Sequence, residues 1–183
     1  CRVDHRRAVG RIEQVGLVSD DFAARQFARF GKTVLVLVDR EHARGAAAAL
    51  IAYDPNVRLV VEPDVARWRA TLQWMLPRTH LLKISDEDLG LLHPGLAPEA
   101  AAAQWLAQGV RCVVITRGAA GALAFCGSAR AAAAPVKVQV IDTVGAGDTF
   151  QAALLTWLAE HDRLSIGGVG TLDEAAKIEI HPD

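Results

Sequence analysis

The chain has 183 residues, of which 51% are hydrophobic and 22% are charged, and its formal net charge at pH 7 is −1. This balance is typical of a globular domain and excludes an intrinsically disordered chain. Because basic residues are not in excess, the composition argues against a protein that binds nucleic acid through a cationic surface. No apolar run approaches the length that spans a bilayer, and the N-terminus shows no signal-peptide pattern.

The cysteines and the first residue bear on where the protein works and on whether the chain is whole. Cys112 and Cys126 lie in apolar runs, and the cysteines show neither paired nor metal-ligand spacing. We therefore expect these two to be buried free thiols in a reducing cytosol, and the protein to be cytoplasmic. The chain begins with Cys1 rather than methionine, which indicates a fragment or a processed product.

The first third of the chain alternates between charged, alanine-rich and β-branched segments, after an opening stretch without periodicity. In order, the pattern predicts little structure over residues 1–19, a helix over 20–31, a strand covered on both faces over 33–39, an alanine-rich helix over 41–50 and a short strand over 51–53.

The rest of the chain continues the alternation of helices and strands. The pattern predicts helices from Asp64 to Pro77, over 86–92 with Ser85 as its cap, and from Pro98 to Gln108, and it predicts strands over 80–84, 111–116 and 122–126, with a glycine turn over 117–121 and a connecting link over 129–134. This alternation indicates an α/β layered fold with a mostly parallel sheet. We expect a single domain over residues 1–183, weakly patterned over 1–30 and 163–183.

One stretch, residues 142–150 (DTVGAGDTF), joins an apolar run to a segment with helical periodicity. Its glycines, Gly145 and Gly147, allow a tight path and expose backbone N–H groups. Unpaired amides and the positive end of a helix then point at one place, which favours an anion. Asp148 is expected there too, where a carboxylate suits the deprotonation of a hydroxyl that attacks a phosphate. The alternatives are a simple tight turn for the glycines and a helix N-cap for Asp148.

Four segments together resemble one known family. The stretch from Asp142 to Leu155 is similar, position by position, to the C-terminal signature of the PfkB carbohydrate kinase (ribokinase-like) family. Three further segments resemble elements of its fructokinase-type members in order and spacing: DPNVR at 54–58, KISDED at 83–88 and TRGAAG at 116–121. The resemblance covers roughly residues 45–160, and four ordered segments are more specific than any one of them.

The resemblance implies a partial three-layer αβα fold of the ribokinase-like type. It also implies ATP-dependent phosphorylation of a sugar hydroxyl, with Mg²⁺ on the nucleotide. By this likeness Asp148 is the catalytic base, and Gly145, Ala146 and Gly147 form the anion hole for the transferred phosphoryl group. Phosphoryl transfer depends on positioning and charge stabilisation, which agrees with the interpretation from the residues alone.

By the same resemblance, a second set of residues contacts the substrate or ATP. It comprises Arg58, Thr116, Gly118, Gly121, Asp142 and Thr143. A guanidinium can grip two phosphate oxygens, which suits Arg58, and a solvated surface arginine is the equal alternative. For Thr116 and the two glycines of its turn, the alternative is an ordinary β-turn between strands.

Ser85 and Asp88 occupy the places of the family's N-x-x-E pair, which influences Mg²⁺ and phosphate. Because the asparagine is a serine here and the glutamate an aspartate, we expect no direct protein ligand to the metal and only an indirect role through water. A capping box at a helix start explains the same two residues and is the favoured interpretation. Asp54 and Asn56 are expected to brace their loop rather than to touch a ligand.

Two hypotheses follow, because the family's N-terminal sugar-binding half and the helical pair over the adenine are not visible in this chain. The first is a sugar kinase most like fructokinase, present as its C-terminal part or as a shortened member, with 2-keto-3-deoxygluconate and ribose as other substrates to consider. The second is a non-catalytic remnant or nucleotide-binding domain of the same fold. A generic α/β anion-binding domain is the alternative outside the family. The expected partners are a sugar and ATP, without nucleic acid or membrane, and a homodimer is left open.

Overall fold

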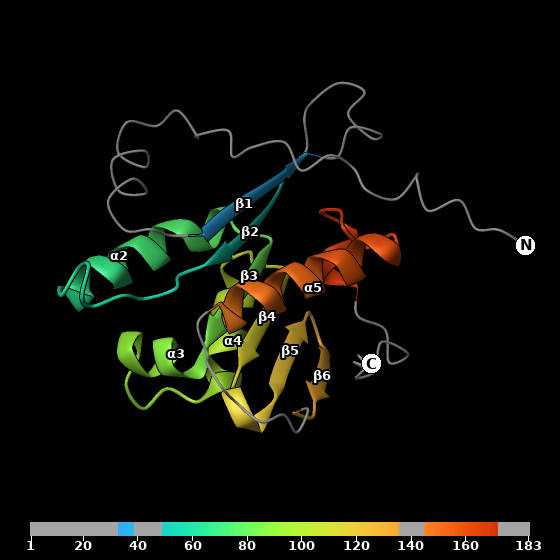
Figure 1. Cartoon of the computed structure of the whole chain (residues 1–183). Helices are drawn as coiled ribbons and strands as arrows, with labels where there is room; N and C mark the ends of the chain where they lie inside the picture. Colours follow the sequence, from blue (N-terminus) through green and yellow to red (C-terminus); the bar gives the residue numbers. More distant parts are fainter. Residues whose placement is uncertain (1–32, 39–48, 136–144, 172–183) are drawn as a thin grey trace, which may run out of the picture.

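The computed structural model describes residues 33–38, 49–135 and 145–171, with side chains described from Leu50 onwards. Figure 1 shows one central sheet with helices α2, α3 and α4 on one side and α5 on the other. The described part of the chain is therefore a three-layer αβα arrangement, as expected for the ribokinase-like class. None of the described helices is both long and apolar enough to cross a membrane.

Within the described residues, the sheet has six strands that lie side by side in chain order. They are β1 (Thr33–Val38), β2 (Ala49–Asp54), β3 (Leu81–Ser85), β4 (Cys112–Thr116), β5 (Ala122–Cys126) and β6 (Ala129–Ala133). Parallel pairing is confined to the centre, where β2 pairs with β3 and β3 with β4. The outer pairs, β1 with β2, β4 with β5 and β5 with β6, are antiparallel. Consequently β2, β3 and β4 end at the same edge of the sheet.

One face of the sheet is covered by α2 (Val65–Met75), α3 (Asp86–Leu92) and α4 (Pro98–Ala107). Asp64 caps α2 by accepting from the N–H of Ala66, and Pro98 sits in the first turn of α4, where its missing N–H costs nothing. The helices bury Trp68 and Trp105 against strand residues such as Leu82. This is the larger of the two cores.

The opposite face is covered by α5 (Ala146–Glu160), the longest described helix. Side chains alternate along a strand, so Leu81, Cys112 and Val114 face α5 while their neighbours face the first core. Of the residues on α5, Leu158 is fully buried in this second core and several others are half-buried. The chain then ends its described part with a short 3₁₀ turn, Gly168–Gly170.

Most predicted elements are found, and two differ. The segment 129–134, predicted as a link, is strand β6 over Ala129–Ala133. Alanine favours helix, but a two-residue turn at Gly127 and Ser128 returns the chain alongside β5, and this pairing overrides propensity. Leu50, predicted as the end of a helix, belongs to β2. The strand predicted over 33–39 is found as β1, and its side chains, with the predicted covering of both faces, lie outside what the structure describes. The predicted helix over 20–31 and residues 41–48 lie outside the described residues.

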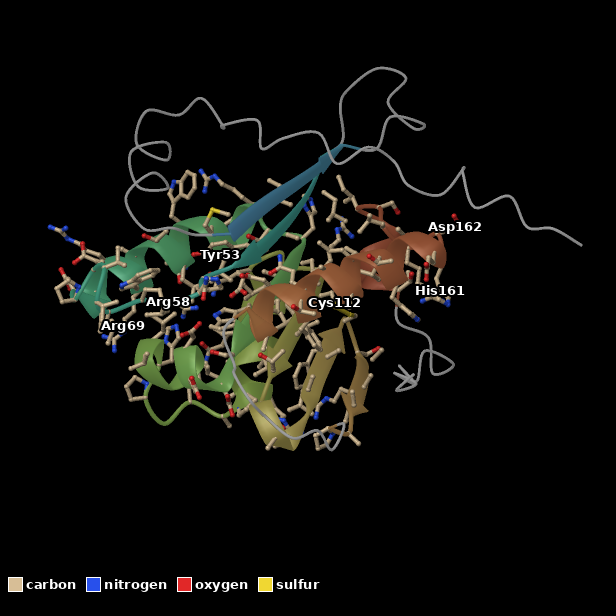
Figure 2. The ribbon with its side chains drawn as sticks, viewed as in Figure 1. Tyr53, Arg58, Arg69, Cys112, His161 and Asp162 are labelled. Atoms are coloured by element: carbon tan, nitrogen blue, oxygen red, sulfur yellow. A yellow bond between two sulfur atoms is a disulfide. The ribbon has the colours of Figure 1, made fainter. Side chains whose placement is uncertain are left out.

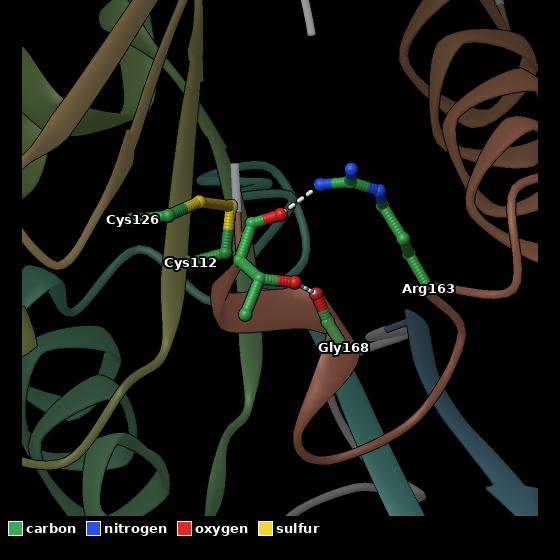
Figure 3. Close-up of a disulfide and its surroundings, with 5 residues drawn as sticks. Cys112, Cys126, Arg163 and Gly168 are labelled. Atoms are coloured by element: carbon green, nitrogen blue, oxygen red, sulfur yellow. Dashed lines mark hydrogen bonds between the residues drawn. A yellow bond between two sulfur atoms is a disulfide. The ribbon is translucent and has the colours of Figure 1, made fainter. Parts of the chain in front are cut away.

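Cys112 and Cys126 form a disulfide, so the prediction of free thiols is wrong in this structure, although both side chains are buried as expected. They oppose each other across the antiparallel pair β4–β5, with their Cα atoms 4.4 Å apart (Figure 3). A spacing of 14 residues gives no hint of this, because the register of the hairpin decides it. The two cysteines consequently give no argument for a reducing compartment.

Candidate active site

The carboxyl ends of the three parallel strands bring polar side chains together at one edge of the sheet. Asp54 ends β2, Ser85 ends β3 and Thr116 ends β4, and Ser85 and Thr116 are direct partners in the register. In an open α/β sheet, this edge is where ligands bind. The segments that the sequence singled out, 54–58, 83–88 and 116–121, all begin here.

The first turn of α5 has backbone N–H groups that find no acceptor within the helix. Gly145 is its N-cap residue and provides no side-chain cap, and the first helical hydrogen bond runs from the N–H of Thr149 to the carbonyl of Gly145, at 2.8 Å. The N–H groups of Ala146, Gly147 and Asp148 therefore have no acceptor within the helix. These donors and the positive end of the helix macrodipole make the turn a candidate site for an anion.

The two glycines of this turn are needed for different reasons. Gly145 has φ of +78°, a left-handed conformation that favours glycine, and a Cβ there would meet nothing within 4 Å. Gly147 has no positive φ, but a Cβ there would lie 2.8 Å from Nζ of Lys83. Backbone conformation thus favours glycine at position 145, whereas the nearby ammonium of Lys83 leaves little space for a side chain at position 147.

Asp148 lies in the first turn of α5, three residues after the N-cap, with an exposed side chain. The N-cap is Gly145, so the alternative of Asp148 as the helix N-cap is not what the structure shows. The negative charge of Asp148 contributes to raising the pKa of Asp54, which places the carboxylates in each other's field. A hydroxyl brought to the anion site would therefore meet a carboxylate from the same helical turn.

Asp54 and Lys83 form a buried ion pair below this turn. Nζ of Lys83 donates to Oδ2 of Asp54 at 2.8 Å, and their side chains are only 6% and 3% exposed. Burial is the main cause that raises the pKa of Asp54, while the charge and hydrogen bond of Lys83 oppose the rise. Oδ1 of Asp54 also accepts the N–H of Asn56 at 3.1 Å, which confirms that Asp54 braces its loop.

The loop after β2 is tied to helix α3 through Asp88. Oδ2 of Asp88 accepts the N–H of Val57 at 3.2 Å, and burial raises the pKa of this carboxyl. Asn56 holds a left-handed conformation, with φ of +44°, that turns the loop toward α3. Arg58, labelled in Figure 2, is exposed and donates from Nη1 to the carbonyl of Val57 at 3.1 Å, and its charge acts on the carboxyl of Asp88.

Ser85 caps α3, as predicted: its Oγ accepts the N–H of Asp88 at 3.0 Å. The second bond of a capping box does not form with Asp88, because its carboxylate bonds to Val57 instead. Among the residues that the structure describes, no three His, Cys, Asp or Glu side chains are grouped so that they could hold a metal ion.

Thr116 leads into a tight turn, which agrees with the structural alternative named for it. The N–H of Arg117 donates to the carbonyl of Gly121 at 2.7 Å, and Gly118 and Gly121 have φ of +49° and +82°. A Cβ on Gly121 would lie 2.0 Å from the carbonyl oxygen of Ala133, so only glycine fits. Asp142 and Thr143, the remaining predicted binding residues, lie outside the described residues.

Sequence reasoning missed the roles of two buried polar side chains. Lys83 was read only as part of a motif, although a lysine inside the apolar strand LLKIS signals a buried partner. Gln151, on α5 one turn after Gly147, is 2% exposed, and both polar atoms of its side-chain amide lack a partner within the described part of the chain. Its signal is weaker, because an isolated glutamine on a helix is ordinarily a surface residue.

The fold and the site together define a class: an α/β protein with an anion site where a helix begins above the carboxyl ends of parallel strands. The sequence profile of the pfkB family carbohydrate kinases matches residues 12–176. The chain therefore belongs to the pfkB family of carbohydrate kinases. The matched range extends beyond residues 45–160 at both ends, so the motif resemblance underestimated it.

The relatives and solved structures agree with this assignment. A fructokinase of Rhizobium leguminosarum bv. trifolii is 38% identical over 146 residues, which cover 80% of this chain and 44% of that protein. A putative ribokinase II from E. coli, solved in complex with ATP and Mg²⁺, has a TM-score of 0.52 at 32% identity, over 62% of this chain and 35% of that one.

A fructokinase from Vibrio cholerae O395, solved in fructose, ADP and calcium ion bound form, has a TM-score of 0.54 at 28% identity. The match covers 64% of this chain and 40% of that chain. The chain thus spans less than half the length of curated fructokinases that it matches.

Proposed function

We propose that the protein is an ATP-dependent sugar kinase, most like a fructokinase, in which Asp148 is the base. The observation that carries this proposal is the first turn of α5. Its N–H groups have no acceptor within the helix, and the exposed carboxylate of Asp148 lies in the same turn, near the carboxyl ends of the parallel strands. Membership of a carbohydrate kinase family and similarity to fructokinases support the choice of substrate class. Similarity to kinases solved with ATP or ADP supports the choice of phosphoryl donor.

The proposed reaction transfers the γ-phosphoryl group of ATP to a sugar hydroxyl. The hydroxyl oxygen forms a bond to the γ-phosphorus, its proton passes to the carboxylate of Asp148, and the bond to the bridging oxygen breaks to release ADP. The N–H groups of Ala146 and Gly147, with Gly145 as the turn before them, stabilise the charge on the transferred group. Mg²⁺ on the nucleotide supplies further charge neutralisation when it is bound.

Other residues have binding roles in the proposal. Arg58 reaches phosphate or substrate oxygens, which its exposed guanidinium supports. Ser85 and Asp88 act on the metal only through water, because both already hold structural hydrogen bonds. The nucleotide contacts the tight turn over residues 116–121 and the segment just before the first turn of α5. Its contact residues are Thr116, Gly118, Gly121, Asp142 and Thr143.

A second candidate is a nucleotide-binding remnant of the same fold without turnover. It is favoured by one observation: the uncapped first turn of α5 offers N–H donors to a phosphate whether or not a sugar is bound. In this candidate, the anion site keeps its affinity for phosphate while no sugar is brought to Asp148. The two candidates differ in turnover and not in fold.

The test is an assay of sugar-dependent ADP release with fructose, ribose and 2-keto-3-deoxygluconate, run on the wild-type chain, Asp148→Asn and Glu160→Gln. Glu160 is an exposed carboxylate at the far end of the same helix, so its loss controls for charge alone. We expect turnover on one sugar, a loss of about 10²- to 10⁴-fold in Asp148→Asn and full activity in Glu160→Gln. Turnover that survives Asp148→Asn contradicts the base, and ATP binding without turnover on any sugar establishes the remnant.

A further inference from the structure

Lys83 is a buried cation in the middle of a strand, and the proposed reaction gives it no role. It is 5% exposed and lies on the α5 face of β3, on the same side as Leu81. Its one ion-pair partner among the described residues is Asp54. A buried ion pair is weak evidence for stability, since apolar residues of similar size often serve as well. The pair therefore calls for an explanation other than stability.

The ammonium of Lys83 lies close to the first turn of α5, residues 145–148, which we call the anion loop. A Cβ on Gly147 would be 2.8 Å from Nζ, the one contact found for that position outside its own helix and chain neighbours among the described residues. The lysine thus occupies the space that a side chain at 147 would fill, on the side of the first turn that faces the sheet.

Asp54 fixes where the ammonium lies. Its Oδ2 accepts from Lys83, while its Oδ1 is held by the N–H of Asn56, so the carboxylate cannot rotate freely. The charged groups around this point come from several elements: Asp54 from β2, Lys83 from β3, Asp148 from α5, and, one step further, Asp88 from α3 and Arg58 from the loop. Of these groups Lys83 contacts Asp54, and the charges of Asp148 and Asp88 act on the same site through their interaction with Asp54.

We propose that Lys83 is the positioning residue of the anion loop: anchored on Asp54, its ammonium supports Gly147 from below and so sets where the N–H donors and Asp148 of the first turn of α5 stand. This inference deepens the proposed function and rests on it for the effect on turnover. Lys83 itself touches no substrate. It acts through the backbone of Gly147, and the geometry of Asp148 follows from that contact.

The first experiment compares Lys83→Met with the wild type in the ADP-release assay. Methionine keeps the length of the side chain and removes the charge, so we expect kcat to fall by about 10²-fold while KM for ATP and for sugar changes by less than about threefold. A merely structural lysine would lower only the folded fraction and with it the apparent kcat, so each rate is divided by the folded fraction measured by circular dichroism on the same preparation. A kcat within twofold of wild type overturns the proposal.

The second experiment does not depend on turnover. In the ligand-free chain, the side-chain carboxyl of Asp54 is titrated by ¹³C NMR in the wild type, Lys83→Met and Asp148→Asn. Loss of Lys83 is expected to raise the pKa of Asp54, and loss of Asp148 is expected to lower it, because the two charges act on it with opposite sign. If Asp148→Asn leaves this pKa unchanged, the loop is not held beside the pair and the proposal fails.

The third experiment is a double-mutant cycle on the urea midpoint, with Lys83→Ala and Gly147→Ala. We expect Gly147→Ala to lower the midpoint in the wild type and to lower it less in Lys83→Ala, where the space is free. Gly90→Ala, on an exposed helix position with nothing within 4 Å, is the matched control for a glycine replacement. Additive effects contradict the contact.

The outcomes keep the two proposals apart. Absence of turnover on every sugar contradicts the proposed function of the chain, and the titration and the cycle still decide whether Lys83 holds the loop. If Lys83→Ala fails to fold, the Asp148→Asn titration decides alone. Turnover with an unchanged Lys83→Met contradicts only the role of Lys83.

Discussion

The two faces of the sheet are built from the same strands and differ in how they are covered. On the face of α2, α3 and α4, the largest side chains, such as Trp68 and Trp105, are fully buried in one continuous core. On the face of α5, Phe150, Leu154 and Trp157 are only half-buried. Between this helix and β3 to β6 lies an apolar cavity of about 40 Å³.

This difference indicates that one face of the sheet serves mainly stability, while the other carries the candidate active site. The first face is closed by apolar packing, and the charged groups that face it, such as Asp88, serve local hydrogen bonds. The second face carries the ion pair of Asp54 and Lys83, the unpartnered amide of Gln151 and the uncapped turn before Asp148. Unsatisfied polar groups in a loosely packed region are typical of a functional site.

The largest expected difference between the faces is in tryptophan truncation. Trp105→Ala leaves a cavity in the closed core and is expected to lower the free energy of unfolding by about 3–5 kcal/mol. Trp157→Ala removes a half-buried ring that stacks on His161 and is expected to cost well under half of that. Urea denaturation measures both. Equal losses would show that the two faces are packed alike and would remove the comparison.

The face covered by α2, α3 and α4, here called the closed face, was also the more predictable from sequence. Helical periodicity and caps placed α2, α3 and α4 to within about two residues, because Asp64, Ser85 and Pro98 are strong local signals. Strand β6 was missed because its alanines carry no strand signal, and its structure depends on pairing with β5. The strand follows from pairing across this hairpin and not from the apolar pattern of the segment itself.

For the candidate site, sequence located the helix start and its glycines but not what lies beneath them. Gly145 could be read from its conformational role, whereas the reason for Gly147 is a lysine 64 positions earlier in the chain, and no local pattern reports that contact. The pairing of Asp88 with Val57 was hidden in the same way, behind a cap motif that explains Asp88 only in part. The disulfide likewise follows from register and not from spacing.

A smaller effect is expected at the cap of α3, on the closed face. Ser85→Ala removes the acceptor for the N–H of Asp88 and is expected to cost about 1 kcal/mol in the free energy of unfolding. Ser128→Ala, at an exposed turn between β5 and β6, is the matched control and should be close to neutral. If Ser85→Ala is neutral as well, the cap does not hold α3 in place.

The smallest expected effect is a pH dependence of the free energy of unfolding, caused by His80 at the amino ends of the parallel strands. Burial, helped by the charge of Arg111, lowers the pKa of His80, whose Nδ1 accepts the N–H of Ile51 at 3.0 Å. Because the folded pKa lies below the unfolded value, the unfolded state binds more protons between the two. The contribution of His80 is therefore present above the unfolded pKa and is lost as the pH falls through this window.

His80→Gln keeps a hydrogen-bond acceptor and cannot titrate, so its unfolding free energy should fall less than that of the wild type between pH 7.5 and pH 5.5, by roughly a few tenths of a kcal/mol since water screens a half-buried ring. Urea denaturation at the two pH values measures the difference. Identical slopes for the two proteins would mean that His80 titrates alike in both states.

The most direct test of the account compares binding and turnover in a single variant, Asp148→Asn. Calorimetry of ATP binding and the rate of sugar-dependent ADP release are measured on the same preparation, beside the wild type. The account predicts an ATP affinity within about threefold of wild type, because the N–H donors of the turn remain, and a rate reduced by about 10²-fold or more, because the base is gone. A variant that binds ATP and keeps its rate would contradict the assignment of Asp148 as the base.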